Sequence, residues 1–123
     1  MAGLLLFCGA LLPMTEALVV LTNCPDAEVA DRIARTLVEQ GVAACVNRLA
    51  AVESIYRWEG AIERATEVPL LIKTTRDRYG DVELAIRQLH PYQVPEIIAL
   101  TVADGHAAYL RWILEATQPP LMA

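Results

Sequence analysis

An alternating stretch at residues 52–75 constrains the fold of this chain more than any other feature of its sequence. Residues 52, 54, 56 and 58 share one face of it, so the aromatic side chains of Tyr56 and Trp58 point the same way. Glu59-Gly60 is a turn signal, and Pro69 on the return arm indicates an edge strand or a bulge. The stretch therefore predicts a β-hairpin with unusually long arms, which we expect to pair with a neighbouring subunit.

Shorter elements precede and follow the hairpin. Continuous apolar runs predict buried strands at 17–21, 42–46 and 96–102, and apolar residues at helical spacing predict helices at 25–40, from 75 or 77 to 90, and beyond Gly105. The order strand-helix-strand, hairpin, strand-helix-strand-helix predicts an α+β fold of the ferredoxin-like, split βαβ type. A doubly wound parallel sheet is the alternative, against which the hairpin and the lack of a GxGxxG motif count.

The length and the composition fit a single domain. A chain of 123 residues, 55% of them hydrophobic, supplies enough apolar material for one continuous core. We place this domain at 15–117, between a disordered or accessory extension at 1–14 and a tail at 118–123. The apolar run in 1–13 has no basic residues before it, no small-x-small cleavage pattern and too few residues to cross a bilayer. We therefore expect a cytoplasmic protein without a membrane partner, and an export signal is the alternative.

Charge and cysteine content narrow the possible partners. The net charge of -5, with one lysine and no basic cluster, predicts that the chain does not bind nucleic acid. The mean hydropathy of +0.37 is high for so short a chain and indicates that apolar surface is buried against another subunit. Three cysteines, an odd number without CxxC spacing, fit free thiols in a reducing compartment.

The sequence argues against common catalytic arrangements. The histidines are His90 and His106, and Ser54 lies on an alternating strand rather than in a GxSxG motif, so a hydrolase triad is not expected. No GxxxxGK pattern contains the lysine, Lys73, which argues against a phosphate loop. We therefore expect a protein that is not an enzyme. An enzyme that uses Lys73 or carboxylates as acid and base is the alternative.

A metal site is one candidate function. His90, Glu96 and a thiol, Cys24 or Cys45, supply an imidazole, a carboxylate and sulfur, a ligand set that suits copper or zinc. Pro91 ends the second predicted helix and disfavours helical geometry at His90. The alternative for His90 is an imidazole hydrogen-bonded to backbone at this helix end, and for Cys45 it is a small core residue.

An aromatic cleft is the other candidate. Tyr56, Trp58 and Tyr92 are suited to line a ligand pocket. Alternatively these aromatic side chains form a subunit interface, in which Tyr and Trp are enriched, and both readings hold if the cleft lies between subunits. The polar groups of such a pocket would be Glu63, Glu67, Lys73 and Glu96.

Five segments together resemble the CutA family of divalent-cation tolerance proteins. They follow one another in the family's order, and the resemblance covers nearly all of 17–117. The extension at 1–13 lies outside it. The segments are AACVN at 43–47, YRWEG at 56–60, LIKTT at 71–75, HPYQVPE at 90–96 and YLRWI at 109–113.

The resemblance implies a ferredoxin-like subunit in a homotrimer, with the hairpin packed between subunits. It also implies a link to copper and other divalent cations, so we expect a trimer that binds or responds to metal ions, copper first among them. Carried over by motif, the residues around an inter-subunit cleft are Tyr56, Trp58, Glu67, Lys73, Tyr92 and Glu96, and the candidate metal ligands are His90, Glu96 and Cys24.

One departure and one alternative belong to this resemblance. Some members of the family have a cysteine at the position that aligns with Thr22, whereas here the thiol is two residues later, at Cys24. The family also has a structural kinship with PII-type signalling trimers. The alternative function is therefore a small-molecule sensor that acts through an unknown partner protein.

Overall fold

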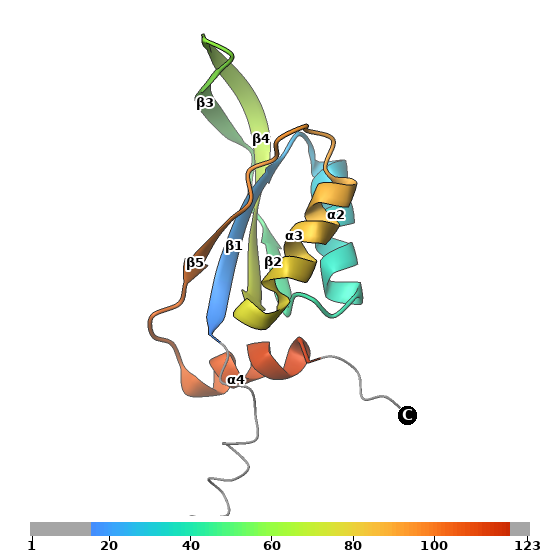
Figure 1. Cartoon of the computed structure of the whole chain (residues 1–123), viewed down its shortest axis with the longest axis vertical. Helices are drawn as coiled ribbons and strands as arrows, with labels where there is room; N and C mark the ends of the chain where they lie inside the picture. The colour runs from blue at the N-terminus through green and yellow to red at the C-terminus, as the bar shows by residue number, and fades with distance from the viewer. Residues whose placement is uncertain (1–15, 119–123) are drawn as a thin grey trace, which may run out of the picture.

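A five-stranded antiparallel sheet organises the chain (Figure 1), and the computed structural model describes residues 16–118. The strand order is β2-β4-β1-β5, and β3 pairs with β4. All of these pairings are antiparallel, so the prediction of an α+β fold is confirmed and the alternative of a doubly wound parallel sheet is wrong. The strands are β1 (Ala17–Cys24), β2 (Cys45–Arg48), β3 (Val52–Trp58), β4 (Ala61–Thr75) and β5 (Ile98–Thr101).

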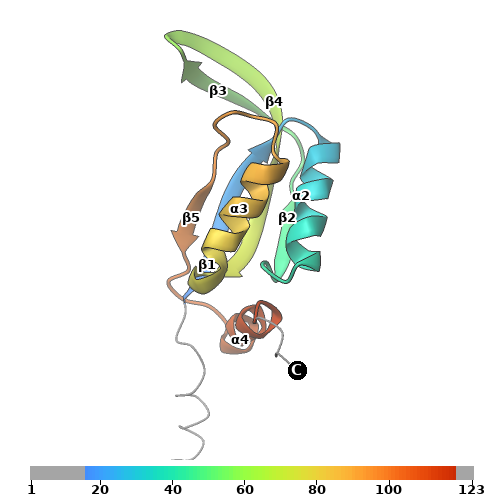
Figure 2. The ribbon, with the colours of Figure 1, turned by 45° about the vertical axis from the view of Figure 1, so that its right-hand side comes forward.

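Two helices cover one face of this sheet and a third lies across its end. Both ribbon views place α2 (Ala27–Glu39) beside α3 (Tyr79–Leu89), with α4 (Ala107–Ala116) below them (Figure 2). A short 3₁₀ turn, η1 (Arg76–Arg78), leads into α3. α2 joins β1 to β2 and α3 joins β4 to β5, and in each case one other strand lies between the two strands that the helix joins.

The limits of the described region bear on two predictions. The extension at 1–14 lies outside it, and so does the tail at 118–123 except for its first residue. Within residues 16–118 no helix is both long and apolar enough to cross a membrane.

The core lies between the sheet and the helices α2 and α3. Burial alternates along β1, where each second side chain is buried, and the buried ones face buried partners on β4, as in the pairs Val20 with Ile72 and Cys24 with Val68. The apolar stripes of the two helices complete this cluster with Ala30, Ile33, Leu37, Val82, Ala85 and Ile86.

The ends of α2 differ from the prediction for local reasons. The helix begins at Ala27 because Asp26 is extended and its carboxylate accepts a hydrogen bond from the backbone of Val29 at 2.9 Å. At the other end the amides of Val42 and Ala43 both donate to the carbonyl of Leu37. Since these amides close the helix, the strand predicted at 42–46 begins only at Cys45.

The hairpin prediction is confirmed. Glu59 and Gly60 have φ angles of 49° and 83°, the left-handed conformation that a two-residue hairpin turn requires. Arg48 pairs with Leu70 and Val52 with Glu67, so three residues (49–51) face only two (68–69). The predicted bulge beside Pro69 is therefore present. The predicted edge position is wrong, because β4 lies between β2 and β1.

Within residues 16–118 no helix covers the sheet face opposite α2 and α3, which is called the uncovered sheet face below. Ile98 and Leu100 on β5 lie beside Leu21 and Val19 on that face, and they are 50% and 54% exposed. The strand predicted at 96–102 is present, but its predicted burial and its bounds are wrong. The strand covers only Ile98–Thr101, lies at an edge of the sheet, and has all four residues exposed.

Candidate functional site

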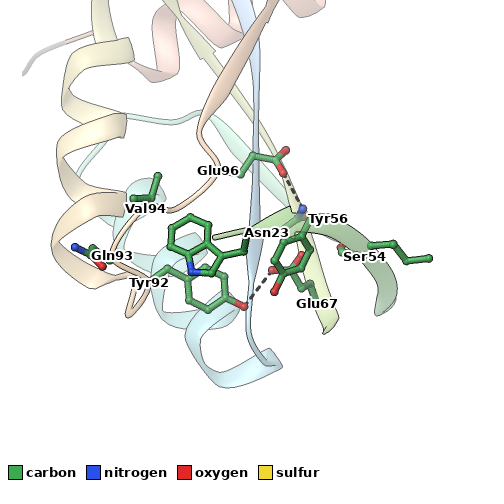
Figure 3. Close-up of a pocket in the computed structure, with 10 residues that line it drawn as sticks. Asn23, Ser54, Tyr56, Glu67, Tyr92, Gln93, Val94 and Glu96 are labelled. Atoms are coloured by element: carbon green, nitrogen blue, oxygen red, sulfur yellow. Dashed lines mark hydrogen bonds between the residues drawn. The ribbon is translucent and has the colours of Figure 1, made fainter. Parts of the chain in front are cut away.

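A cavity of about 600 Å³ lies where the hairpin meets the loop between α3 and β5. Figure 3 shows side chains from β1, from the hairpin and from the loop turned toward one another there. The loop is the HPYQVPE segment, which leaves α3 at His90 and bends at residues 92–94 before it reaches β5. The main polar and aromatic side chains of the lining are Asn23, Tyr56, Trp58, Glu67, Tyr92 and Glu96.

Glu67 is the buried carboxylate of this cavity. It stands on β4 opposite Val52 and is 7% exposed. The hydroxyl of Tyr92 donates a hydrogen bond of 3.0 Å to its Oε2 atom (Figure 3). Burial, together with this bond and the charge of Glu67, raises the pKa of Tyr92 to about 12, so the hydroxyl keeps its proton and acts as a donor at neutral pH.

Glu96 is the second carboxylate, and Asn23 fixes its position. The Nδ2 atom of Asn23, at the end of β1, donates a hydrogen bond of 3.0 Å to Oε1 of Glu96. The backbone oxygen of Asn23 also contacts Nε2 of His90 at 2.6 Å. Asn23 therefore holds both ends of the segment from His90 to Glu96.

His90 is buried, with both ring nitrogens bonded to backbone. Its Nδ1 atom accepts a hydrogen bond of 3.2 Å from the amide of Tyr92, which leaves Nε2 as the donor to the Asn23 oxygen. The rings of His90 and Tyr92 also meet edge to face, with centroids 4.6 Å apart. At the helix end His90 has ψ of 133°, the extended geometry predicted for a residue before proline.

Cys24 offers no ready metal ligand. Its side chain is fully buried in the core cluster. Burial raises its pKa to about 11, with smaller contributions from Asp26 and Glu67, whereas a metal ligand has to be a thiolate. Within residues 16–118 no group of three or more His, Cys, Asp or Glu side chains is placed to hold a metal ion. The structure therefore does not assemble Cys24, His90 and Glu96 into one centre.

The residues predicted for the aromatic cleft divide into two groups. Tyr56, Trp58, Glu67 and Tyr92 line the cavity together. Lys73 does not line it, because this side chain lies on the uncovered sheet face, where it donates a hydrogen bond to Asn47.

The sequence analysis did not identify Asn23 or Ser54 as cavity residues. Asn23 lies two residues beyond the strand predicted at 17–21, and Ser54 lies on the predicted hairpin, yet both line the cavity. The hydrogen bond from Asn23 to Glu96 joins residues 73 positions apart, and no local sequence pattern predicts such a contact.

Comparison with known proteins relates this chain to one family. The model of the CutA1 divalent ion tolerance protein family matches residues 18–116. The divalent-cation tolerance protein CutA of Thermus thermophilus is 46% identical over 99 residues, which make up 80% of this chain and 96% of that protein. Protein CutA of Homo sapiens is 43% identical over 96 residues, or 78% of this chain, but the match spans only 54% of the human protein.

Solved structures give the same relationship. The crystal structure of CutA1 from the psychrotrophic bacterium Shewanella superposes with a TM-score of 0.82 at 44% identity, over 85% of this chain and 97% of that one. The structure of the divalent cation tolerance protein from Thermus thermophilus also gives a TM-score of 0.82, at 45% identity, over 83% of this chain and 99% of that one.

Proposed function

The chain belongs to the CutA1 divalent ion tolerance protein family, and from this premise we propose that it is a homotrimeric divalent-cation tolerance protein that binds copper or other divalent metal ions. The proposal includes a ferredoxin-like subunit, a cytoplasmic location and no catalytic turnover. The family description names divalent ion tolerance and lends no support to the alternative of a PII-like signalling trimer.

The uncovered sheet face is the observation that supports assembly into a trimer. On this face Ile98 and Leu100 are about half exposed, and on the hairpin Ile55 and Ile62 are 61% and 64% exposed. The hairpin projects beyond the helices (Figure 1), and the arm 61–67 of β4 has β3 on one side only within residues 16–118. Apolar surface beside an unpaired strand edge favours contact with another copy, and three copies in a closed ring would cover it.

Metal binding is proposed for the cavity rather than for the core. Glu96 is the predicted ligand that is exposed there, and its carboxylate is oriented by Asn23. Oriented carboxylates are conserved features of metal sites because the outer partner fixes the ligand. His90 would have to give up two backbone bonds, and Cys24 would have to leave the core and ionise. These two residues do not fit a copper centre in this conformation, and their ligation stays a prediction.

Titration of the EDTA-treated protein with Cu(II), followed by calorimetry, tests this proposal. We expect Glu96→Ala to weaken copper binding by roughly 10-fold or more. Glu28→Ala is the matched control, since Glu28 is an exposed carboxylate on α2 whose one ion pair, to Arg32, is 3.8 Å long. Weaker binding by His90→Ala or Cys24→Ala would add that residue to the ligand set.

Two results would count against the proposal. Equal copper affinity of the wild type and of all three site variants would contradict the assignment of Glu96, His90 and Cys24 as ligands. A monomer found by light scattering at micromolar concentration would contradict the proposed trimer.

A further inference from the structure

Glu67 is a buried carboxylate without a cationic partner in the part of the chain that the structure describes. None of the ion pairs found within residues 16–118 includes Glu67 or Glu96. The hydrogen bond that Glu67 receives there comes from the neutral hydroxyl of Tyr92. A carboxylate that is only 7% exposed to water is unfavourable unless positive charge or further donors compensate it.

Aromatic rings line the cavity together with this carboxylate. Tyr56 and Trp58 from β3 and Tyr92 from the loop line the same cavity. The hydroxyl of Tyr56 is close enough to that of Tyr92 to help raise its pKa. Ring faces attract cations, whereas none of the described residues that line the cavity is lysine or arginine. The described lining residues therefore present carboxylates and aromatic rings to the cavity, and none of them carries a positive charge.

The size and the lining of the cavity leave room for an organic cation in addition to a metal ion at Glu96. A volume of about 600 Å³ falls in the range of small-molecule sites. A metal ion would leave the rings, and the apolar side chains of Ile55 and Val94 beside them, without contacts. An organic cation of moderate size would contact the rings and the carboxylate together.

The hydrogen-bonding capacity of Glu67 narrows the class of organic cation that fits the cavity. Tyr92 donates a hydrogen bond to Oε2. No other group within residues 16–118 donates to Glu67, so Oε1 and the remaining lone pairs can accept hydrogen bonds from a ligand. A ligand that carries N–H groups supplies those donors, and a charge-assisted bond of this kind is stronger than a neutral one. A quaternary ammonium group brings charge but no donor.

We propose that this cavity binds a small organic cation with N–H groups, an alkyl- or arylammonium or a guanidinium compound, with Glu67 as its counter-ion and Tyr56, Trp58 and Tyr92 as its ring contacts. This binding goes beyond divalent-cation tolerance and does not rest on it. Glu67 takes no part in the copper ligation proposed above, and the test uses metal-free protein.

Calorimetry on the EDTA-treated full chain with two matched probes tests this assignment. Benzylammonium carries the charge and the donors, and benzyl alcohol is its neutral counterpart of nearly equal size. We expect benzylammonium to bind on the order of tenfold more tightly, and Glu67→Gln to abolish that preference while leaving the alcohol's affinity unchanged. Glu28→Gln should leave both affinities unchanged, because Glu28 is exposed on α2 and does not line the cavity.

Equal affinities of the wild type for the two probes would overturn the proposal. The absence of benzylammonium binding would overturn it too. Tyr56→Leu provides a second variant should Glu67→Gln fail to fold, and benzylammonium affinity unaffected by the loss of this ring would also contradict the assignment. Loss of copper binding alone would bear on the proposed function and leave this inference intact.

Discussion

The Nε2 atom of His90 lies 2.6 Å from the backbone oxygen of Asn23, and this contact joins the end of α3 to the end of β1. The two residues are 67 positions apart in the sequence. The same Asn23 reaches Glu96 through its side chain, so one residue of β1 organises the whole loop that closes the cavity.

Replacing His90 by alanine should destabilise the protein, because the Asn23 oxygen and the Tyr92 amide would lose their partners in a buried place. We expect a loss of about 1–3 kcal/mol in the free energy of unfolding. Urea unfolding at fixed protein concentration measures it. His106→Ala is the matched control, since His106 is exposed and its side chain makes no capping bond at the start of α4. Equal stability of the two variants would contradict the structural role of His90.

Removing the hydroxyl of Tyr92 should lower the free energy of unfolding, because the buried carboxylate of Glu67 loses its hydrogen-bond donor. In Tyr92→Phe the Oε2 atom loses its donor while the carboxylate stays buried, and we expect a loss of about 1–3 kcal/mol. In a Glu67→Leu background the same change should cost much less, since no buried charge then needs the donor. Additive effects in this double-mutant cycle, measured by urea unfolding, would mean that the bond does not couple the two side chains. Tyr109→Phe, on the exposed side of α4, serves as the control.

The stability should fall above pH 9 through the Cys24 thiol. Burial raises the pKa of this thiol from 9.0 to about 11. The unfolded chain ionises near pH 9 while the folded protein stays protonated, so the contribution of Cys24 to stability is complete below pH 9 and is lost as the pH rises to about 11. The whole pKa difference corresponds to roughly 3 kcal/mol.

Comparison with Cys24→Ala isolates this effect. Between about pH 8 and pH 11 the wild type should lose roughly 2 kcal/mol more unfolding free energy than the variant does. Tyr92, whose pKa is raised to about 12, weakens both proteins in the same direction above pH 10, and most of this effect cancels in the difference because Cys24 is the smallest of the causes that raise the Tyr92 pKa. Parallel pH profiles would show that the Cys24 thiol does not titrate differently in the two states.

A lysine at position 100 should prevent assembly. Leu100 is 54% exposed on the uncovered sheet face, and three like charges brought into a trimer interface would be desolvated there. Leu84→Lys is a close control, because Leu84 is equally exposed at 54% but lies on α3. Light scattering should find a monomer for the first variant and a trimer for the second. A trimer for Leu100→Lys would exclude this face from the interface.

The features that the sequence predicts well are those decided by neighbouring residues. The turn at Glu59-Gly60, the bulge beside Pro69 and the extended geometry of His90 before Pro91 follow from local backbone preferences. The amphipathic stripes of α2 and α3 are equally local. These signals sufficed for the α+β architecture and for the face that Tyr56 and Trp58 share.

Predictions that depend on distant contacts succeeded less often. The apolar run at 96–102 indicates a buried strand, but burial also depends on what covers each face, and no helix of this chain within residues 16–118 covers the face of Ile98. His90, Glu96 and Cys24 carry suitable ligand atoms. For His90 the alternative of an imidazole hydrogen-bonded to backbone at the helix end is confirmed, at both ring nitrogens. The sequence does not reveal that the core encloses Cys24.

The place of β1 in the sheet has a consequence for the folding rate. Its two neighbours come from far along the chain: Ala17 pairs with Thr75, 58 residues later, and Leu18 pairs with Thr101, 83 residues later. Closing such long loops costs conformational entropy before the strand pairing can stabilise the structure. The helices and the hairpin, in contrast, form from local contacts. We therefore expect the central strand to be inserted late, over milliseconds to seconds, and hydrogen-exchange labelling during refolding should find the amides of β1 protected after those of α2 and α3.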